Sequence, residues 1–234
     1  TGDYADRAGH RGNSRYSDEH LAAVLGSAVA NGFQVCIHAI GDAAVLQAIR
    51  TLETVRRSNP GEWLRHRIEH FQMAGPEVVA RAMALGVITA MQTIHAVADK
   101  PMAETRLTPD QLAVSYPWRA VLDRGGIIAN GSDSPMDGVN PFHGFHAAVS
   151  RTAFSCHVEA DARVRMTREE ALKSYTLWAA AAEQAQARKG SLTPGKAADF
   201  IVLDRDIMTC PEDAIKDTRV LMTVLAGETV FGGL

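Results

Sequence analysis

The sequence predicts an α/β fold in which short parallel strands alternate with helices. Strand-then-helix units follow one another between residues 33 and 130. The four strand-like runs are short, and all but residues 67–70 are mostly apolar, which is typical of strands buried on both faces. Neither glycine pattern of nucleotide-binding open sheets, GxGxxG or GxxxxGKS/T, occurs in the chain. The alternation therefore indicates either a small doubly wound sheet or half of an eight-unit barrel.

Each element is predicted from its composition and its flanking residues. The strands are expected at residues 33–38, 67–70, 87–91 and 127–130. Helices between them are expected at residues 42–57, 76–86 and 117–125, and a long polar loop is expected at residues 93–115. Pro76 suits the first turn of its helix, because proline lacks the N–H that a helix start leaves unbonded.

The remaining segments flank this series of units. Residues 1–15 are polar and glycine-rich and predict a loop, after which Ser17 caps a helix that ends near residue 31. Thr167 and Glu170 form a capping box that opens one alanine-rich helix to about residue 187. Residues 199–203 and 220–231, with a turn at 227–228, are β-type and predict a separate small sheet.

Composition excludes several classes of protein. The chain has 234 residues, 46% of them hydrophobic, which is enough to bury a large core. Its formal net charge of −3 gives no basic surplus for nucleic acid, and no apolar run reaches the length of a membrane span. The three cysteines, Cys36, Cys156 and Cys210, form no CxxC pair and favour a reducing compartment, so we expect a cytoplasmic protein.

Each predicted strand ends in, or runs closely into, a residue that can bind metal or move a proton. These residues are His38, His70, His95 and Asp133. The carboxyl ends of parallel strands meet on one side of a sheet, so the four side chains are expected to converge. Imidazoles with a carboxylate suit zinc or another borderline divalent metal, and three ligands with an open position are typical of a catalytic site.

Other histidines are interpreted as structural. A single histidine at a strand end is more often a hydrogen-bonded structural residue, so the shared placement of four residues carries the metal hypothesis. His66 lies at the start of its strand, away from the expected site. His143 and His146 have the spacing of a helical ligand pair, but they lack the glutamate of HExxH and are interpreted as surface or packing residues.

Around these positions the chain resembles the metal-dependent amidohydrolase superfamily, most closely amidohydrolase family 3, which holds N-substituted formamide deformylases and N-acyl-amino-acid hydrolases. The matching stretches are residues 38–42 (HAIGD), 65–70 (RHRIEH), 86–92 (GVITAMQ), 131–135 (GSDSP), 166–172 (MTREEAL) and 189–199 (KGSLTPGKAAD). The ordered set is specific and covers nearly the whole chain.

The resemblance implies a (β/α)8 barrel with one or two divalent metal ions, expected to be zinc, at its carboxyl face. His38 and His70 match the ligands after the fifth and sixth barrel strands. Asp133 matches the aspartate after the eighth strand, which binds metal and serves as general base and acid. His95 falls where the family contacts substrate. Residues 1–188 would form the second half of the barrel, and residues 189–234 would form part of a small β-sandwich.

The chain departs from the family pattern in one large respect. It contains no His-x-His, the first metal-binding motif of the family, and no counterpart of the bridging ligand after the fourth strand. We therefore expect the second half of an enzyme, which would need the missing half or a second copy as a partner, with a homo-oligomer as one form of that assembly. Alone, the chain is expected to bind metal weakly and to hydrolyse little.

Three functions are compatible with these features. The first is hydrolysis of a carbon–nitrogen bond in an amide or formamide, with a small-molecule substrate and Asp133 moving the proton. The second is a non-catalytic regulatory or binding role on a degenerate barrel, which the absent His-x-His motivates. The third keeps the metal but changes the reaction to deamination or ester hydrolysis.

Overall fold

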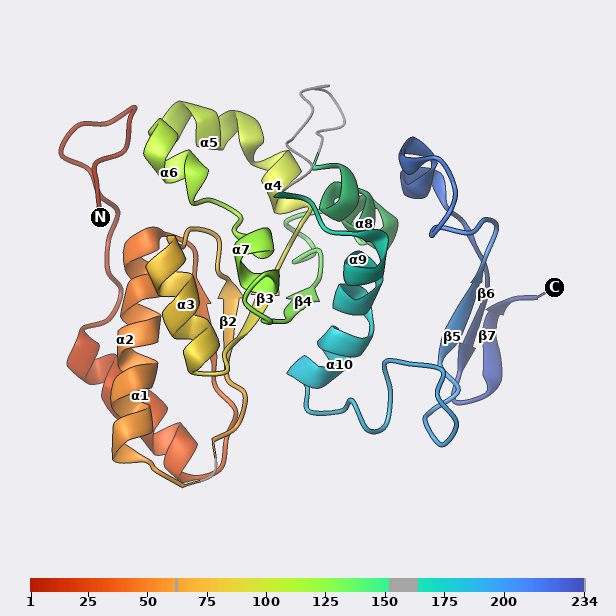
Figure 1. Ribbon diagram of the computed structural model, residues 1–234, viewed down its shortest axis with the longest axis horizontal. Helices are drawn as coiled ribbons and strands as arrows, with labels where there is room; N and C mark the ends of the chain where they lie inside the picture. Colours follow the sequence, from red (N-terminus) through yellow and green to blue (C-terminus); the bar gives the residue numbers. More distant parts are fainter. Residues whose placement is uncertain (62, 152–163, 234) are drawn as a thin grey trace. The chain divides into compact units, whose positions relative to one another are not determined.

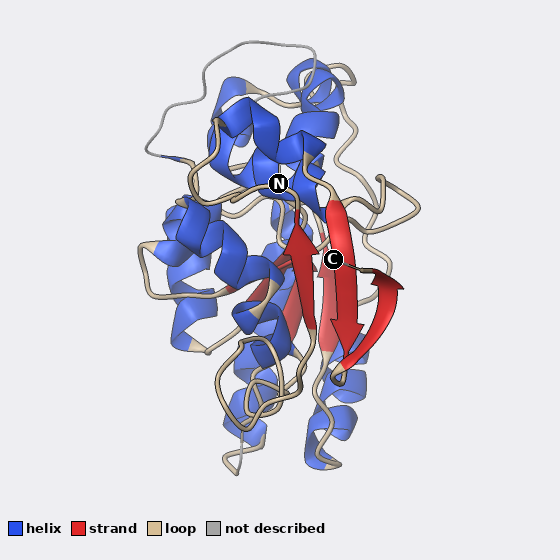
Figure 2. Cartoon of the chain, turned by 90° about the vertical axis from the view of Figure 1, so that its right-hand side faces the viewer, coloured by secondary structure: helices blue, strands red, loops and turns tan. Residues whose placement is uncertain are grey.

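The computed structural model describes residues 1–61, 63–151 and 164–233 of the chain, so Cys156 lies outside the described residues. Within this part, β1 to β4 form one sheet and β5 to β7 form a second sheet (Figures 1 and 2). The chain divides into two compact units, the first with residues 1–91 and 99–128 and the second with residues 92–98 and 129–234. The α/β class predicted from the sequence is confirmed.

The first sheet runs in chain order, β1-β2-β3-β4. Its strands are β1 (Cys36–Ala39), β2 (Arg67–His70), β3 (Ile88–Met91) and β4 (Ile128–Asn130). The pairs β1–β2 and β2–β3 are parallel, with Ile37 opposite Ile68 and Arg67 opposite Ile88. All four strands were expected at or near these places, and three of them, β1, β3 and β4, lie in the short, mostly apolar runs that are typical of buried parallel strands.

Helices of the first unit pack in series beside this sheet: α1 (Asp18–Ala30), α2 (Asp42–Ser58), α3 (Pro76–Ala84) and α7 (Trp118–Leu122) (Figure 1). Ser17 caps α1 by accepting a hydrogen bond from the backbone N–H of His20, as predicted. Ile49 and Leu52 of α2 are fully buried, and so is Trp118 of α7. The helices α2, α3 and α7 thus contribute several apolar side chains to the core of this unit, whereas α1 buries Leu25 alone.

The expectation of a long loop at residues 93–115 was wrong. The segment holds three short helices, α4 (His95–Ala98), α5 (Lys100–Arg106) and α6 (Pro109–Ala113). Pro101 and Pro109 lie in the first turns of α5 and α6, and Thr108 forms a capping box with Gln111. Each helix has only one or two turns, which is too short for a helical period to stand out in the sequence.

The second unit contains α8 (Pro141–Ser150), α9 (Arg168–Tyr175), α10 (Leu177–Ala182) and the 3₁₀ helix η2 (Glu212–Asp217). The capping box of Thr167 and Glu170 is confirmed, but the single helix expected to about residue 187 is broken at Thr176. Thr176 has φ −130° and ψ −88°, and its hydroxyl donates to the carbonyl of Leu172. A threonine hydroxyl that bonds back to its own helix competes with the helical ladder.

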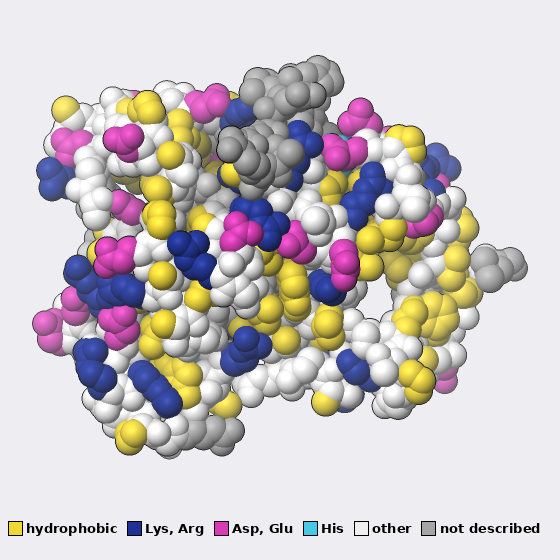
Figure 3. All heavy atoms as spheres, in the orientation of Figure 1, with side chains coloured by type: hydrophobic (Ala, Val, Ile, Leu, Met, Phe, Trp, Pro, Cys, Tyr) yellow, Lys and Arg dark blue, Asp and Glu magenta, His cyan; other side chains and the backbone are white. Residues whose placement is uncertain are grey.

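Strands β5 (Phe200–Leu203), β6 (Val220–Leu225) and β7 (Glu228–Gly232) form the predicted separate antiparallel sheet. Leu221 and Leu225 alternate along β6, and Ile201 and Phe231 both pair with the intervening Thr223, so these apolar side chains share one face. Hydrophobic side chains gather over these strands in Figure 3, and all four are exposed. We call Ile201, Leu221, Leu225 and Phe231 the open sheet face.

Two expectations concern larger organisation. The boundary between a barrel half at residues 1–188 and a β-sandwich part at residues 189–234 stays a prediction, and β5 to β7 all lie after that boundary. In the described part of the chain, no helix combines the length and apolar character that crossing a bilayer requires.

Candidate metal and substrate site

Two of the four predicted site residues lie next to each other. His38 stands near the carboxyl end of β1 and His70 ends β2, the parallel neighbour of β1. Their ring centroids are 4.6 Å apart with an interplanar angle of 71°. Residues that are 32 positions apart in the sequence are thus brought together because adjacent parallel strands end on the same side of the sheet.

The backbone at His70 is unusual for residues with side chains. His70 has φ 71° and Phe71 has φ 46°, two consecutive residues in the left-handed region. Phe71 is fully buried. Such conformations cost on the order of 1–3 kcal/mol each and persist where the surrounding structure holds them, often at functional sites.

The paired imidazoles fit a shared metal ion. Zinc–nitrogen bonds of about 2.0–2.1 Å would place two bound rings roughly 4.5–5.2 Å apart, centroid to centroid, for bond angles of about 90–110°. The observed 4.6 Å lies within that range. Neutral imidazole nitrogens are also the donors that zinc and its neighbours prefer.

His95 and Asp133 both belong to the second unit. His95 begins α4, and its Nε2 lies 3.3 Å from Oδ2 of Asp137. Asp133 follows β4, is exposed, has φ 56° and accepts a hydrogen bond at its carbonyl from the N–H of Met136. A carboxylate beside a histidine ring fixes which nitrogen carries the proton, so Asp137 orients His95.

Among the described residues, no three or more histidine, cysteine, aspartate or glutamate side chains gather as a group that could hold a metal ion. The structure therefore brings together the two histidines of the predicted set. The full set of His38, His70 and Asp133 stays a prediction, as does a substrate contact for His95.

A buried polar network fastens the segments that lead to His95 and Asp133. The N–H of Thr93 donates to Oδ1 of Asn130 (3.1 Å), and the Thr93 hydroxyl donates to the carbonyl of Gly144 (2.7 Å). Burial raises the pKa of Tyr175 to about 12, although the hydrogen bond between its hydroxyl and Thr93 works in the opposite direction. Thr93 and Asn130, which shortly precede His95 and Asp133 in the chain, are thus held in place by hydrogen bonds.

The other histidines lie in structural surroundings. His66 is 1% exposed, its Nδ1 accepts the N–H of Val35, and its ring meets Trp63 edge to face. Burial lowers the pKa of His66. His146 is buried in α8 with its Nε2 3.6 Å from a carboxylate oxygen of Asp213. Both observations fit the structural interpretation made from the sequence.

Sequence reasoning missed residues that support the site. Asp137 lies four positions after Asp133 on the same loop, and this closeness to a predicted site residue could have identified it as a candidate. Gln72, Tyr116 and Asp99 form a hydrogen-bonded network just beyond His70. No sequence pattern predicts this network, because its three residues come from separate segments of the chain.

Comparison with known proteins finds that the chain is similar to amidohydrolases. A family model described as the amidohydrolase family matches residues 3–231. The putative amidohydrolase YtcJ of Bacillus subtilis (strain 168) is 28% identical over 233 residues, which are 97% of this chain and 43% of that protein. The N-substituted formamide deformylase of Arthrobacter pascens is 28% identical over 220 residues, 93% of this chain and 40% of that protein.

A solved structure agrees with these relatives. An uncharacterized metal-dependent hydrolase from Pyrococcus horikoshii OT3 superposes with a TM-score of 0.79 at 26% identity, over 91% of this chain and 42% of that one. This likeness confirms the predicted fold class, the second half of a (β/α)8 barrel with part of a small β-sandwich. The chain spans about two fifths of the length of the proteins that it matches. From residue 3 to residue 231, the chain belongs to the amidohydrolase family.

Proposed function

We propose that this chain is part of a metal-dependent hydrolase that cleaves a carbon–nitrogen bond other than a peptide bond, in a small amide or formamide. The observation that carries the proposal is the pair of His38 and His70 rings, 4.6 Å apart at the ends of adjacent parallel strands. Similarity to an N-substituted formamide deformylase supports a carbon–nitrogen bond as the target.

Each site residue has a distinct role in this proposal. His38 and His70 hold zinc or a similar divalent ion, with one or two ions in the complete enzyme. When bound, such an ion lowers the pKa of water and polarises a carbonyl oxygen. Asp133 helps hold the ion, takes a proton from the attacking water and gives it to the leaving nitrogen. His95, oriented by Asp137, contacts the substrate.

Metal content tests the first part of the proposal. Because the chain alone should bind metal weakly, elemental analysis of the purified chain is expected to find less than one equivalent of zinc, manganese or iron, and the double variant His38→Ala/His70→Ala is expected to lose it. The control variant His10→Ala/His20→Ala removes two histidines outside the pair and should keep the metal. Equal metal in all three proteins would refute the assignment of the pair.

Turnover tests the second part. The chain would be assayed against N-substituted formamides and N-acyl amino acids. It would be tested alone and after mixing with the remaining barrel portion, that is, the barrel part of the Arthrobacter deformylase that this chain does not match. We expect activity only in the reconstituted sample, and we expect Asp133→Asn to abolish it while leaving the protein folded. Turnover that survives Asp133→Asn would remove the proton-transfer role. A metal-loaded, reconstituted protein without turnover on any amide would favour the non-catalytic alternative.

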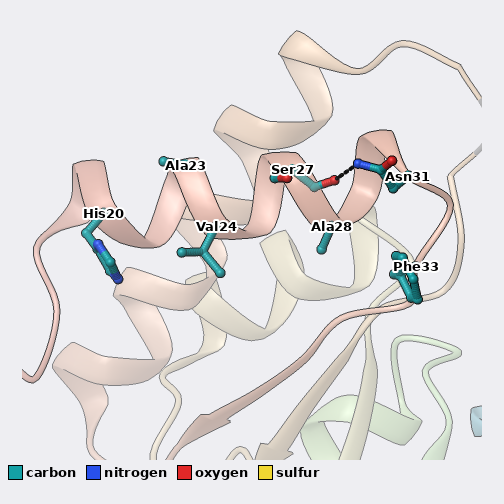
Figure 4. A pocket seen from close by; sticks show the side chains of 7 residues that line it. All are labelled: His20, Ala23, Val24, Ser27, Ala28, Asn31 and Phe33. Atoms are coloured by element: carbon teal, nitrogen blue, oxygen red, sulfur yellow. Dashed lines mark hydrogen bonds between the residues drawn. The ribbon is translucent and has the colours of Figure 1, made fainter.

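We also propose that the remaining length carried by the relatives covers two apolar surfaces of this chain. Ten consecutive residues of α1, 21–30, carry no charge, yet Leu25 alone of these is buried. Val24 and Phe33 are exposed and line an open groove of about 640 Å³ along this helix (Figure 4). The open sheet face is a second such surface. Apolar patches of this kind mark sites of contact with other chains or segments.

Sedimentation measurements test this coverage. The chain mixed with the remaining barrel portion is expected to sediment as a one-to-one complex, and Val24→Glu in the groove is expected to weaken it. A homodimer whose stability is equally sensitive to Val24→Glu would assign the groove to a second copy instead. We also propose a cytoplasmic location, which the sparse cysteines without a CxxC pair in the sequence support.

A further inference from the structure

The segment that carries His70 is held in a strained conformation. His70 and Phe71 both have left-handed backbone angles, and the Phe71 ring is fully buried. Left-handed backbone is unfavourable for residues with a Cβ, so bonds from neighbouring segments have to maintain it. The position of the His70 ring beside His38 therefore depends on what anchors the residues that follow it.

Backbone hydrogen bonds tie this segment to two neighbours. The N–H of Phe71 donates to the carbonyl of Ala39, and the N–H of Met73 donates to the carbonyl of Ile40, both 3.1 Å. These carbonyls immediately follow His38 in the chain. On the other side, the N–H of Tyr116 donates to the carbonyl of Gln72 over 2.6 Å.

Side chains complete the second attachment. Nε2 of Gln72 donates to the Tyr116 hydroxyl over 2.5 Å, and that hydroxyl donates to Oδ2 of Asp99 over 3.2 Å. Nε2 of Gln72 also lies 3.5 Å from the same carboxylate oxygen. Tyr116 is 7% exposed and has φ 51°, so it is itself constrained. A hydroxyl that accepts from an amide and donates to a carboxylate has a single favoured orientation.

We propose that Gln72, Tyr116 and Asp99 are positioning residues that keep the His70 ring beside His38, ready to share a metal ion. This inference rests on the proposed function for the metal, but the ring placement itself does not require metal to be bound. Residues that orient metal ligands through hydrogen bonds commonly change metal affinity by about 10–100-fold when altered. Here the effect is transmitted through the backbone of residues 70–72.

Tyr116→Phe tests the proposal, because it removes the bridging hydroxyl and keeps both the ring and the backbone N–H. Two quantities would be measured: zinc affinity by competition with a chromophoric chelator, and the nuclear Overhauser effect between the His38 and His70 ring protons without metal. We expect roughly tenfold weaker zinc binding and a weakened ring contact, with a cooperative unfolding transition retained. Asp99→Asn keeps an acceptor oxygen and is expected to retain most of the affinity, whereas Asp99→Ala should match Tyr116→Phe.

A matched control separates positioning from general stability. Thr51 is a buried residue of α2 in the same unit whose hydroxyl donates to the carbonyl of Gln47. Thr51→Val also removes a buried hydroxyl, and we expect unchanged zinc affinity and an unchanged ring contact.

The outcomes distinguish the two levels of inference. Wild-type zinc affinity and an intact ring contact in Tyr116→Phe would overturn the positioning role. A ring contact that weakens in Tyr116→Phe, in a protein whose zinc binding is insensitive to His38→Ala, would support positioning and refute the proposed metal site. Equal losses in Thr51→Val and Tyr116→Phe would show that any buried hydroxyl has this effect, and would also overturn the inference.

Discussion

Tyr175 offers a sharp test of the packing in the second unit. Its hydroxyl bonds with Thr93 inside the protein, and burial raises its pKa to about 12 from an ordinary value of 10.0. Between these two values the unfolded chain releases the tyrosine proton while the folded protein keeps it. The unfolded state then binds fewer protons, so the free energy of unfolding falls as the pH rises from about 10 to about 12.

The size of this effect follows from the shift. Two pKa units correspond to about 3 kcal/mol of stability, most of which is lost by about pH 12. Tyr175→Phe cannot ionise and escapes this loss, but it gives up a buried hydrogen bond worth about 1 kcal/mol. The variant should therefore be less stable at neutral pH and more stable at high pH. The two stability curves are expected to cross at about pH 11.

Urea unfolding between about pH 8 and about pH 11.5 would measure both curves. Tyr16, a residue that is 57% exposed, provides the control, and Tyr16→Phe is expected to follow the wild-type curve throughout. Curves for Tyr175→Phe and wild type that remain parallel would mean that Tyr175 ionises as easily in the folded protein as in the unfolded chain. The buried arrangement around it would then be wrong.

Two further substitutions probe the cores of the two units. A Cβ at Gly144 would collide with the Tyr175 hydroxyl, so Gly144→Ala should lower the free energy of unfolding, measured in urea, by about 1–3 kcal/mol. The control is Gly26→Ala, where a Cβ meets no atom within 4 Å and no stability should be lost. Equal losses in the two variants would contradict the packing of Gly144 against Tyr175. Because burial lowers the pKa of His66, the unfolded state gains its proton first as the pH falls below about 6.5, and the protein should lose stability there. His66→Asn, which can still accept the N–H of Val35, should lack this acid dependence in thermal melts across about pH 5–7, and retention of the full dependence would exclude His66 as its source.

The strands and the histidine pair could be predicted because their determinants are local. A short run such as residues 87–91 is apolar enough to identify a buried strand, and the regular alternation of strands and helices marks residues 67–70, which end in His70, as another strand. The direction of adjacent parallel strands then brings His38 to the same side without any further information.

Other features could not be predicted because they depend on contacts between distant segments. The left-handed backbone at His70 and Phe71 is imposed on residues that do not prefer it, and the bonds that impose it come from Ile40 and Tyr116. The break at Thr176 occurs within a stretch whose composition favours an uninterrupted helix. In each case tertiary structure outweighs the local preference on which the prediction was based.

The order of the parallel sheet has a consequence for how the protein can be made. Every strand from β1 to β4 is adjacent to the strand before it in the chain, so no pairing has to wait for a distant segment to arrive. A ribosome releasing this sequence would supply each new strand after the strand that it pairs with, so the sheet can grow strand by strand in the order of synthesis.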